Sequence, residues 1–286
     1  MNNSKIIFTD LDRTLLKDDN SLSEKNLEAL LKIQERKIIT VIATGRNILS
    51  AKRVLTDDLP FDYLIFSSGA GIIDWKSKKV IYENHLIKRE IDLTLEILLR
   101  HKVDFMIHEI IPENHKFFYG RINKENPDFE RRIRLYQHFA QPLKQPLEMK
   151  KASQFIAVLQ ENSETKFNEI KSEIKELKVI RATSPLDHRS IWLEVFPKKV
   201  SKGHSAEWLG NYLKIKREDT VGIGNDFNDL DLLHWTAQSY VVENSPAELK
   251  TKFRVIKSNE EDGFAEITEK ILNTENLGIL SQFFQD

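Results

Sequence analysis

The sequence predicts an α/β protein with a mostly parallel, doubly wound sheet, into which a smaller α+β module is inserted. Strand-like and helix-like patterns alternate up to about residue 82 and again from about residue 199. Between these two sections, adjacent strand-like runs with interspersed helices predominate. The first pattern is typical of parallel sheets, and the second of antiparallel α+β domains. The chain of 286 residues also exceeds the usual limit of about 250 residues for one hydrophobic core, so two domains are expected.

The first section begins with an apolar strand and continues with alternating elements. The run from Lys5 to Thr9 predicts a buried strand. A capping box at 21–24 then precedes a helix whose apolar residues recur at helical spacing from Leu27 to Ile33. Three further strands are expected at 38–43, 63–66 and 79–82.

The middle section predicts a separate module. A helix is expected at about 87–100, followed by two strands joined through Pro112. Another helix begins at Asn126–Pro127, because proline suits the first helical position. The other expected elements are strands at 154–159, 178–182 and 191–196 and a helix at about 164–177. We therefore expect an inserted domain of residues 83–198 and a core domain of residues 1–82 and 199–286.

The last section returns to alternation. Ser201–Gly203 opens a helical stretch from His204 to Leu213, and a short apolar strand follows around Val221. The remaining expected elements are strands at 240–242 and 254–256 and helices around 230–233, 247–250 and 267–271.

Composition limits the classes of partner. The 43 basic and 44 acidic side chains leave a net charge of −1, which gives no electrostatic reason to expect binding to nucleic acid or to an anionic membrane. The absence of cysteine excludes disulfides, thiolate catalysis and cysteine-based zinc sites. Neither a signal segment nor a long apolar run is evident, so a cytoplasmic enzyme with a small-molecule partner is expected; the oligomeric state is left open.

Two carboxylates at the end of the first strand indicate phosphoryl-transfer chemistry. Asp10 and Asp12 are spaced two apart and are followed by the hydroxyl of Thr14. Residues at this spacing share a face of an extended chain, and open α/β sheets bind ligands at the carboxyl ends of their strands. A carboxylate can attack phosphorus and form an aspartyl-phosphate, provided that cationic groups offset the negative charge.

Candidate partners follow later in the chain. The strand at 38–43 ends in Thr44-Gly45-Arg46, which supplies a hydroxyl and a guanidinium. Lys202 lies at a predicted helix N-terminus, where anions are favoured. The strand around Val221 leads into an acidic loop, Asn225–Asp229.

These four motifs, in this order, resemble those of the haloacid dehalogenase (HAD) superfamily, in its Cof-type or sucrose-phosphatase-like branch (subfamily IIB). The resemblance extends over nearly the whole chain and includes the late runs 241–250 and 261–265. It implies a Rossmann-like core with a C2-type cap domain at 83–198 that determines substrate specificity. Asn244, in the first of these runs, could contact either substrate or loop backbone.

The resemblance also implies a role for each motif residue. Asp10 would be the nucleophile and a metal ligand, and Asp12 the general acid/base, with its backbone carbonyl on the metal. The implied cofactor is Mg2+. The residues implied to contact phosphate or substrate are Leu11, Thr44, Gly45, Arg46, Lys202 and Asn228. Those implied to hold the metal are Asp10, Asp12, Asn225, Asp226 and Asp229.

Two positions depart from the family pattern. Arg13 stands where the family usually has glycine, and Asn225 stands where it usually has aspartate, with Asp226 next to it. An amide oxygen can still bind Mg2+, but the site loses one formal negative charge unless Asp226 or Asp229 compensates.

The leading functional prediction is a Mg2+-dependent phosphatase for a small phosphorylated metabolite, by resemblance a sugar phosphate. A phosphomutase-type phosphotransferase is the alternative within the same chemistry. A phosphosugar-binding or regulatory protein with little turnover is the alternative from another class, suggested by Asn225 and Arg13. Release of free phosphate without isomerisation of the product would distinguish the phosphatase from both.

Overall fold

The chain consists of two compact units. The computed structural model describes residues 5–144, 147–184, 186–187 and 189–283, with side chains as far as Asn273. One unit, here called the core unit, comprises Met1–Ile81 and Ser201–Asp286; the other, the inserted unit, comprises Tyr82–Val200. Among the described residues, no helix combines the length and apolar character needed to cross a bilayer.

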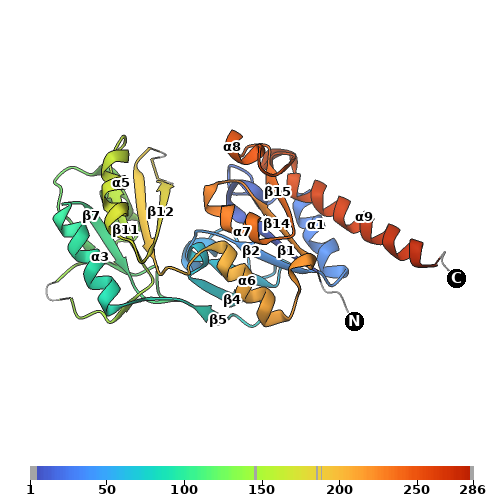
Figure 1. Cartoon of the computed structure of the whole chain (residues 1–286), viewed down its shortest axis with the longest axis horizontal. Coiled ribbons are helices and arrows are strands. Elements are labelled where there is room, and N and C mark those ends of the chain that lie inside the picture. Colours follow the sequence, from blue (N-terminus) through green and yellow to red (C-terminus); the bar gives the residue numbers. More distant parts are fainter. Residues whose placement is uncertain (1–4, 145–146, 185, 188, 284–286) are drawn as a thin grey trace. The chain divides into compact units, whose positions relative to one another are not determined.

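The core unit is built on an eight-stranded sheet of order β16-β15-β14-β1-β2-β3-β4-β5 (Figure 1). The strands from β16 to β3 pair in parallel, and β4 pairs antiparallel to β3. The predicted α/β fold with a parallel sheet is therefore confirmed. The strands are β1 (Ile6–Asp10), β2 (Ile39–Ala43), β3 (Tyr63–Phe66), β4 (Gly71–Asp74), β5 (Lys79–Glu83), β14 (Thr220–Gly224), β15 (Gln238–Val242) and β16 (Arg254–Ile256).

Helices cover both faces of this sheet. The crossover from β1 to β2 and the crossover from β14 to β15 run in opposite directions along the sheet, so right-handed connections place their helices on opposite faces. In agreement, α1 packs with α9, and α6 packs with α7. The helices are α1 (Glu24–Glu35), α2 (Ile48–Ala51), α6 (Lys202–Leu213), α7 (Leu230–Trp235), α8 (Ala247–Lys250) and α9 (Gly263–Phe283).

Strand β1 lies at the switch point of the sheet. All five of its residues are buried, as expected for a parallel strand covered on both faces, and its neighbours are β14 and β2. The chain proceeds away from β1 in one direction through β2 and β3 and away from β14 in the other through β15 and β16. The carboxyl end of β1, at Asp10, is thus where a doubly wound sheet forms its ligand crevice.

Some local predictions differ from the structure. The N-cap of α1 is Ser23, whose side chain accepts the Asn26 N–H at 3.1 Å, rather than the first serine of the predicted capping box, Ser21. The helix expected to run to about 177 ends at Glu173, because Ile174 has ψ 75°, outside the helical range. Strand β4 was not predicted at all. It follows the turn at Ser67–Gly69 after only one residue.

The inserted unit contains a six-stranded sheet of order β12-β13-β11-β7-β8-β9. Its pairs are antiparallel except for β8 with β9, as is common in α+β domains. A further two-stranded sheet pairs β6 with β10. The elements are β6 (Leu86–Ile87), α3 (Lys88–Arg100), β7 (Asp104–His108), β8 (Phe117–Gly120), α4 (Pro127–Leu135), β9 (Ala140–Pro142), β10 (Lys151–Ala152), β11 (Gln154–Leu159), α5 (Glu164–Glu173), β12 (Lys178–Thr183) and β13 (Ile191–Phe196).

The two faces of this sheet bury different side chains. One face forms an apolar core with α3 and α5 that includes Phe105, Phe155 and Leu193. On the other face, Arg132 of α4 lies over the ring of Trp192, which alternates with Leu193 along β13.

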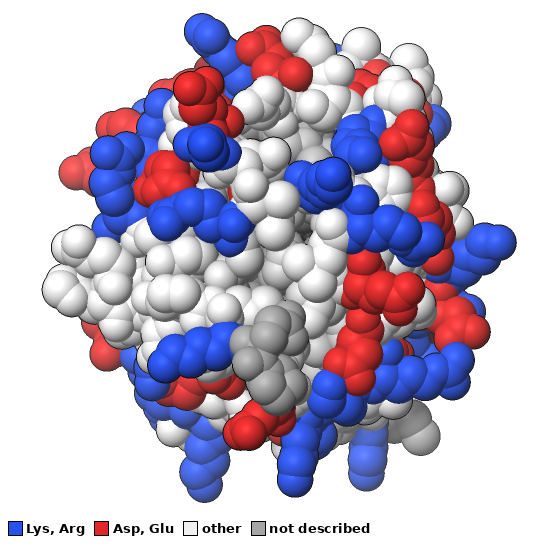
Figure 2. Space-filling model, turned by 90° about the vertical axis from the view of Figure 1, so that its left-hand side faces the viewer, with Lys and Arg blue, Asp and Glu red and all other residues white. Residues whose placement is uncertain are grey.

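On the surface that Figure 2 shows, basic and acidic side chains lie side by side with uncharged areas between them. That face therefore presents no single-signed field to a polyanion.

Candidate active site

The carboxylate of Asp10 lies in a buried cluster at the end of β1. The Nζ of Lys202 donates to Asp10 Oδ1 at 2.5 Å and to Asp229 Oδ1 at 2.6 Å. The Thr14 hydroxyl donates to the other oxygen of Asp10, at 2.9 Å. The structure thus brings together residues of the first, third and fourth sequence motifs.

Close helix packing places Lys202 in this cluster. Lys202 is the first residue of α6, and Ser201 caps the helix by accepting the His204 N–H. A Cβ on Gly203 would lie 2.3 Å from the backbone oxygen of Asp231 in α7, so only glycine permits this approach. The start of α6 is therefore held against the segment that carries Asp229.

The electrostatics of the cluster favour an additional cation. Burial raises the pKa of Asp10 to about 7, Lys202 opposes this increase, and Asp229 and Asp12 add to it. Burial disfavours the Lys202 ammonium, but the two carboxylates outweigh this effect and raise its pKa above the usual value. Three carboxylates are thus offset by one ammonium and the guanidinium of Arg46, described below.

Asp229 organises the acidic loop. Its Oδ2 accepts the backbone N–H groups of Asn225 at 2.9 Å and Asp226 at 3.1 Å, while its Oδ1 accepts from Lys202. Both oxygens of this fully buried carboxylate are therefore engaged by the protein. Asp226 and Asn228 are exposed, and the Asp226 side chain accepts the N–H of Phe227 in its own loop.

Asn225 lies beside the loop Leu11–Leu15 that follows β1, and the oxygen atoms there suit a hard cation. Its Nδ2 donates to the backbone carbonyl of Asp12 at 3.2 Å, and rotation of the amide would present its oxygen instead. Among the described residues, no group of three or more Asp, Glu, His or Cys is arranged to hold a metal. The chemistry of the oxygen donors, namely the Asp10 carboxylate, the Asp12 carbonyl and the Asn225 amide, fits Mg2+, which takes few carboxylates and retains several waters.

The side chain of Asp12 is paired with Arg46. The Arg46 Nε donates to both carboxylate oxygens, at 2.9 and 3.0 Å, and Nη2 donates to Oδ1 at 2.5 Å. Thr44 is fully buried; its hydroxyl accepts the backbone N–H of Arg46 at 3.1 Å and lies 3.5 Å from Asp12 Oδ2.

Gly45 lies between Thr44 and Arg46 in the chain, and a Cβ there would meet the Ser68 hydroxyl oxygen at 3.6 Å, an ordinary contact distance. The Leu11 side chain is buried, so a contact with substrate would come from its backbone.

Side chains from late loops of the chain donate hydrogen bonds to the loop after β1. Arg13 has φ +58°, and its exposed guanidinium pairs with Asp18 at 3.1 Å. Asn244 donates to the Arg13 carbonyl at 2.9 Å and accepts the N–H of Asn259, so it binds loop backbone, one of the two possibilities left open above. Sequence reasoning missed Asn259, which donates to the carbonyl of Leu16 at 3.2 Å, because nothing local distinguishes it from any other loop asparagine.

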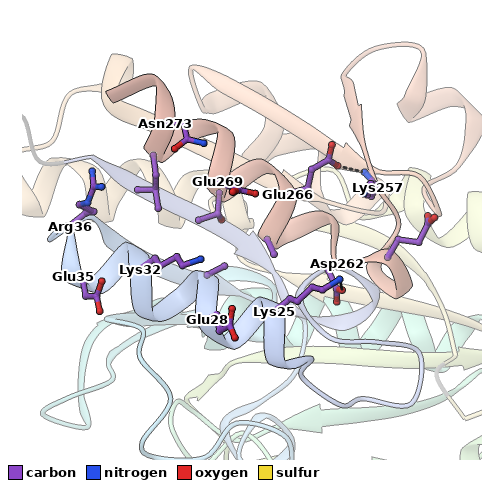
Figure 3. Close-up of a pocket in the computed structure, with 15 residues that line it drawn as sticks. Lys25, Glu28, Lys32, Glu35, Arg36, Lys257, Asp262, Glu266, Glu269 and Asn273 are labelled. Carbon is purple, nitrogen blue, oxygen red and sulfur yellow. Dashed lines mark hydrogen bonds and ion pairs between the residues drawn. The ribbon is translucent and has the colours of Figure 1, made fainter. Parts of the chain in front are cut away.

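A separate groove of about 660 Å3 lies in the core unit between α1 and residues 257–273 (Figure 3). Figure 3 shows Lys25 directed toward Asp262, and Glu266 accepting from the Lys257 backbone. Its lining mixes both signs of charge and includes none of the residues around Asp10. Ligand sites are usually mostly apolar with a few convergent polar groups, so the catalytic candidate remains the Asp10 cluster.

Comparisons with known proteins identify the family. The family model described as haloacid dehalogenase-like hydrolase matches residues 7–267. A 5-amino-6-(5-phospho-D-ribitylamino)uracil phosphatase from Bacillus subtilis is 26% identical over 293 aligned residues, covering 94% of this chain and 98% of the relative.

Solved structures show the same fold. A HAD phosphatase from Bacteroides thetaiotaomicron has a TM-score of 0.77 at 20% identity and covers 93% of this chain and 94% of its own. A HAD subclass IIB sugar phosphatase has a TM-score of 0.73 at 20% identity, with coverages of 94% and 99%. Together with the relatives' names, the family match supports a phosphoric monoester hydrolase. This chain belongs to the haloacid dehalogenase-like hydrolase family.

Proposed function

We propose that this protein is a Mg2+-dependent phosphatase that hydrolyses a small phosphorylated metabolite, of the sugar phosphate class, through an aspartyl-phosphate on Asp10. The observation that carries the proposal is the buried Asp10–Lys202–Asp229 cluster at the switch point of the sheet. The sugar phosphate class is supported by two similar proteins, one named a sugar phosphatase and the other a phosphatase of a phosphoribityl compound.

Asp10 is the proposed nucleophile. Its carboxylate oxygen forms a bond to phosphorus while the bond from phosphorus to the leaving oxygen breaks, and Asp12 gives that oxygen a proton. Water then attacks the aspartyl-phosphate, Asp12 takes a proton from it, and the bond between phosphorus and Asp10 breaks. Lys202 donates two of its three N–H groups to the carboxylates of Asp10 and Asp229, so the third can donate to a phosphate oxygen.

The proposed metal ligands are the Asp10 carboxylate, the Asp12 carbonyl and the amide oxygen of Asn225. Mg2+ bound there supplies positive charge that offsets the negative charge of the transferred phosphoryl group. Because both Asp229 oxygens already accept hydrogen bonds, we assign Asp229 to holding Lys202 and the loop. Asp226 remains a candidate ligand that a metal titration can test.

The inserted unit is the proposed specificity module. All the motif residues belong to the core unit, so the inserted unit is free to carry contacts to the rest of the substrate. This assignment follows the cap role that the family resemblance implies for residues 83–198.

A phosphate-release assay tests the function. The parent protein is incubated with a panel of phosphorylated metabolites and with 4-nitrophenyl phosphate, with Mg2+ or with EDTA. We expect Mg2+-dependent release, strongest for a sugar phosphate, that Asp10→Asn abolishes and that the exposed control Asp57→Asn leaves unchanged. No release from any compound, or equal release by Asp10→Asn, would overturn the proposal.

A further inference from the structure

The guanidinium of Arg46 is occupied by acceptors of the protein itself. Besides the contacts to Asp12, its Nη2 donates to the side-chain oxygen of Asn20 at 2.6 Å, and its Nη1 donates to the carbonyl of Ser50 at 3.4 Å. Arginine has five N–H groups, and these contacts use four of them. A single N–H is left for any other ligand among the described contacts.

This arrangement conflicts with a role as phosphate ligand. Arginine binds phosphate most strongly through two parallel N–H groups. Here the edge formed by Nε and Nη2 faces the carboxylate of Asp12, with distances between 2.5 and 3.0 Å. Arg46 would have to release Asp12 before it could hold a phosphate in the same way.

The pairing fixes the direction of the Asp12 carboxylate. The Asp12 side chain is 40% exposed, whereas that of Arg46 is 21% exposed, so the carboxylate reaches solvent while the arginine supports it from the protein side. Thr44, at 3.5 Å, is a much weaker constraint on it. The orientation of Asp12 therefore depends mainly on Arg46.

Two short backbone elements anchor Arg46 in turn. Asn20 belongs to a turn closed by hydrogen bonds between Lys17 and Ser21 and between Asn20 and Lys17. Ser50 lies in α2, which is capped by the side chain of Asn47. Through Nη2 and Nη1 these elements fix the guanidinium that holds Asp12.

We propose that Arg46 is a positioning residue for Asp12 and not a ligand of the transferred phosphate. This inference rests on the proposed function, in which Asp12 protonates the leaving oxygen. Arg46 holds the carboxyl group where it meets that oxygen, and it makes no bond to the phosphoryl group.

A leaving-group series separates the two roles. The parent, Arg46→Gln and Arg46→Lys are assayed with 4-nitrophenyl, phenyl and benzyl phosphate, and inorganic phosphate is used as a competitive inhibitor. Nitrophenolate leaves without a proton, whereas benzyl alkoxide needs one. We therefore expect Arg46→Gln to reduce kcat/KM for benzyl phosphate by about 100-fold, the lower range for general acid catalysis, and for 4-nitrophenyl phosphate by less than about tenfold.

The other readouts follow from the same argument. The inhibition constant of phosphate should change less than about threefold in Arg46→Gln, because no phosphate contact is lost. Arg46→Lys keeps the positive charge but cannot make the bidentate contact to Asp12, so its activity on benzyl phosphate should lie between those of Arg46→Gln and the parent. Arg254→Lys, at an exposed position in β16, is the control.

An equal loss with all three esters, together with a phosphate inhibition constant raised tenfold or more, would overturn the proposal in favour of phosphate binding. If Arg46→Gln does not fold, Asn20→Ala replaces it, because this change removes an anchor of Arg46 but neither member of the pair. It should produce a smaller loss with the same dependence on the leaving group, and an equal loss with all esters counts against the proposal. An inactive parent would refute the proposed function instead.

Discussion

Lys202 and Asp229 are both completely buried, and the lysine Nζ lies 2.6 Å from the aspartate Oδ1. Asp10 shares the same ammonium group. With Asp229 as a permanent partner, Lys202 keeps its charge during the proposed reaction of Asp10. Asp229 therefore neutralises the buried lysine, and the contact of Lys202 with Asp10, the proposed nucleophile, is a separate one.

Asp229→Ala should strongly destabilise the core unit. Removing one member of a buried ion pair leaves an uncompensated charge, which typically costs about 3–5 kcal/mol. The loop also loses the acceptor of the Asn225 and Asp226 N–H groups. The measurement is the free energy of unfolding from urea titration followed by circular dichroism. Asp226→Ala, at an exposed position in the same loop, is the matched control, and equal losses in both variants would contradict this assignment.

Asn225→Asp should tighten the metal site. A hard dication gains from each anionic ligand, so the Mg2+ concentration for half-maximal phosphate release should fall about tenfold, equivalent to roughly 1.4 kcal/mol. The test is a Mg2+ titration at fixed pH and saturating substrate for the parent, Asn225→Asp and Asp226→Ala. If the midpoint of Asn225→Asp does not move while Asp226→Ala loses its metal dependence, Asp226 is the ligand.

Arg13→Gly should stabilise the protein slightly. A non-glycine residue at φ +58° carries a backbone cost of about 1–2 kcal/mol, which glycine avoids. The exposed ion pair with Asp18 contributes at most about 1 kcal/mol in the other direction. Arg13→Ala is the matched variant, because it removes the pair but keeps the backbone cost. In urea titrations the free energy of unfolding of Arg13→Gly should exceed that of Arg13→Ala by about 1 kcal/mol. The reverse order would show that the loop backbone is unstrained.

Stability should also fall in mild acid because of His108. This histidine is buried, and burial, with a smaller contribution from Arg132, lowers its pKa from 6.5 to about 3. Below pH 6.5 the unfolded chain binds a proton that the folded chain does not, so the stabilisation present above pH 6.5 is lost progressively as the pH falls toward 3. Between pH 7.5 and 4.5 the loss due to this residue is about 2–3 kcal/mol.

The comparison is between the parent and His108→Asn, whose amide can keep the contact that His108 Nδ1 makes with the Asn114 carbonyl at 2.7 Å. The free energy of unfolding of the variant should depend less on pH by that amount. Burial raises the pKa of Glu194 to about 7, so Glu194 changes the free energy of unfolding with pH in the opposite direction. The test therefore uses the difference between the two proteins at each pH, not the curve of either protein alone. The same change at exposed His138 is the control, and parallel curves for parent and His108→Asn would contradict the prediction.

The sequence was most informative about candidate site residues that lie at the ends of strands or the starts of helices. Asp10 and Asp229 could be grouped because the carboxyl ends of neighbouring parallel strands share one edge, and Lys202 could be added from the order of the motifs and its place at a helix start. The direction of individual side chains was not predictable in the same way. Nothing local to Thr44-Gly45-Arg46 indicates that the arginine turns toward Asp12 and Asn20, because these partners lie 34 and 26 positions earlier in the chain.

Local ambiguity accounts for other differences. Ser21 and Ser23 are both ordinary N-cap residues, and the structure selects Ser23 because its hydroxyl oxygen is in reach of the Asn26 N–H. Asn259 donates a hydrogen bond to the carbonyl of Leu16, which lies near the other end of the chain. A single sequence does not reveal a contact between residues so far apart.

The contacts of Asn244 and Asn259 with the loop after β1 have a consequence for synthesis on the ribosome. The loop is translated among the first residues, yet the hydrogen bonds that hold its Arg13 and Leu16 carbonyls come from residues made near the end. Its neighbouring strand β14 is also translated late. A nascent or truncated chain that stops just before residue 244 therefore contains Asp10, Lys202 and Asp229 but lacks the two side chains that hold the loop after β1.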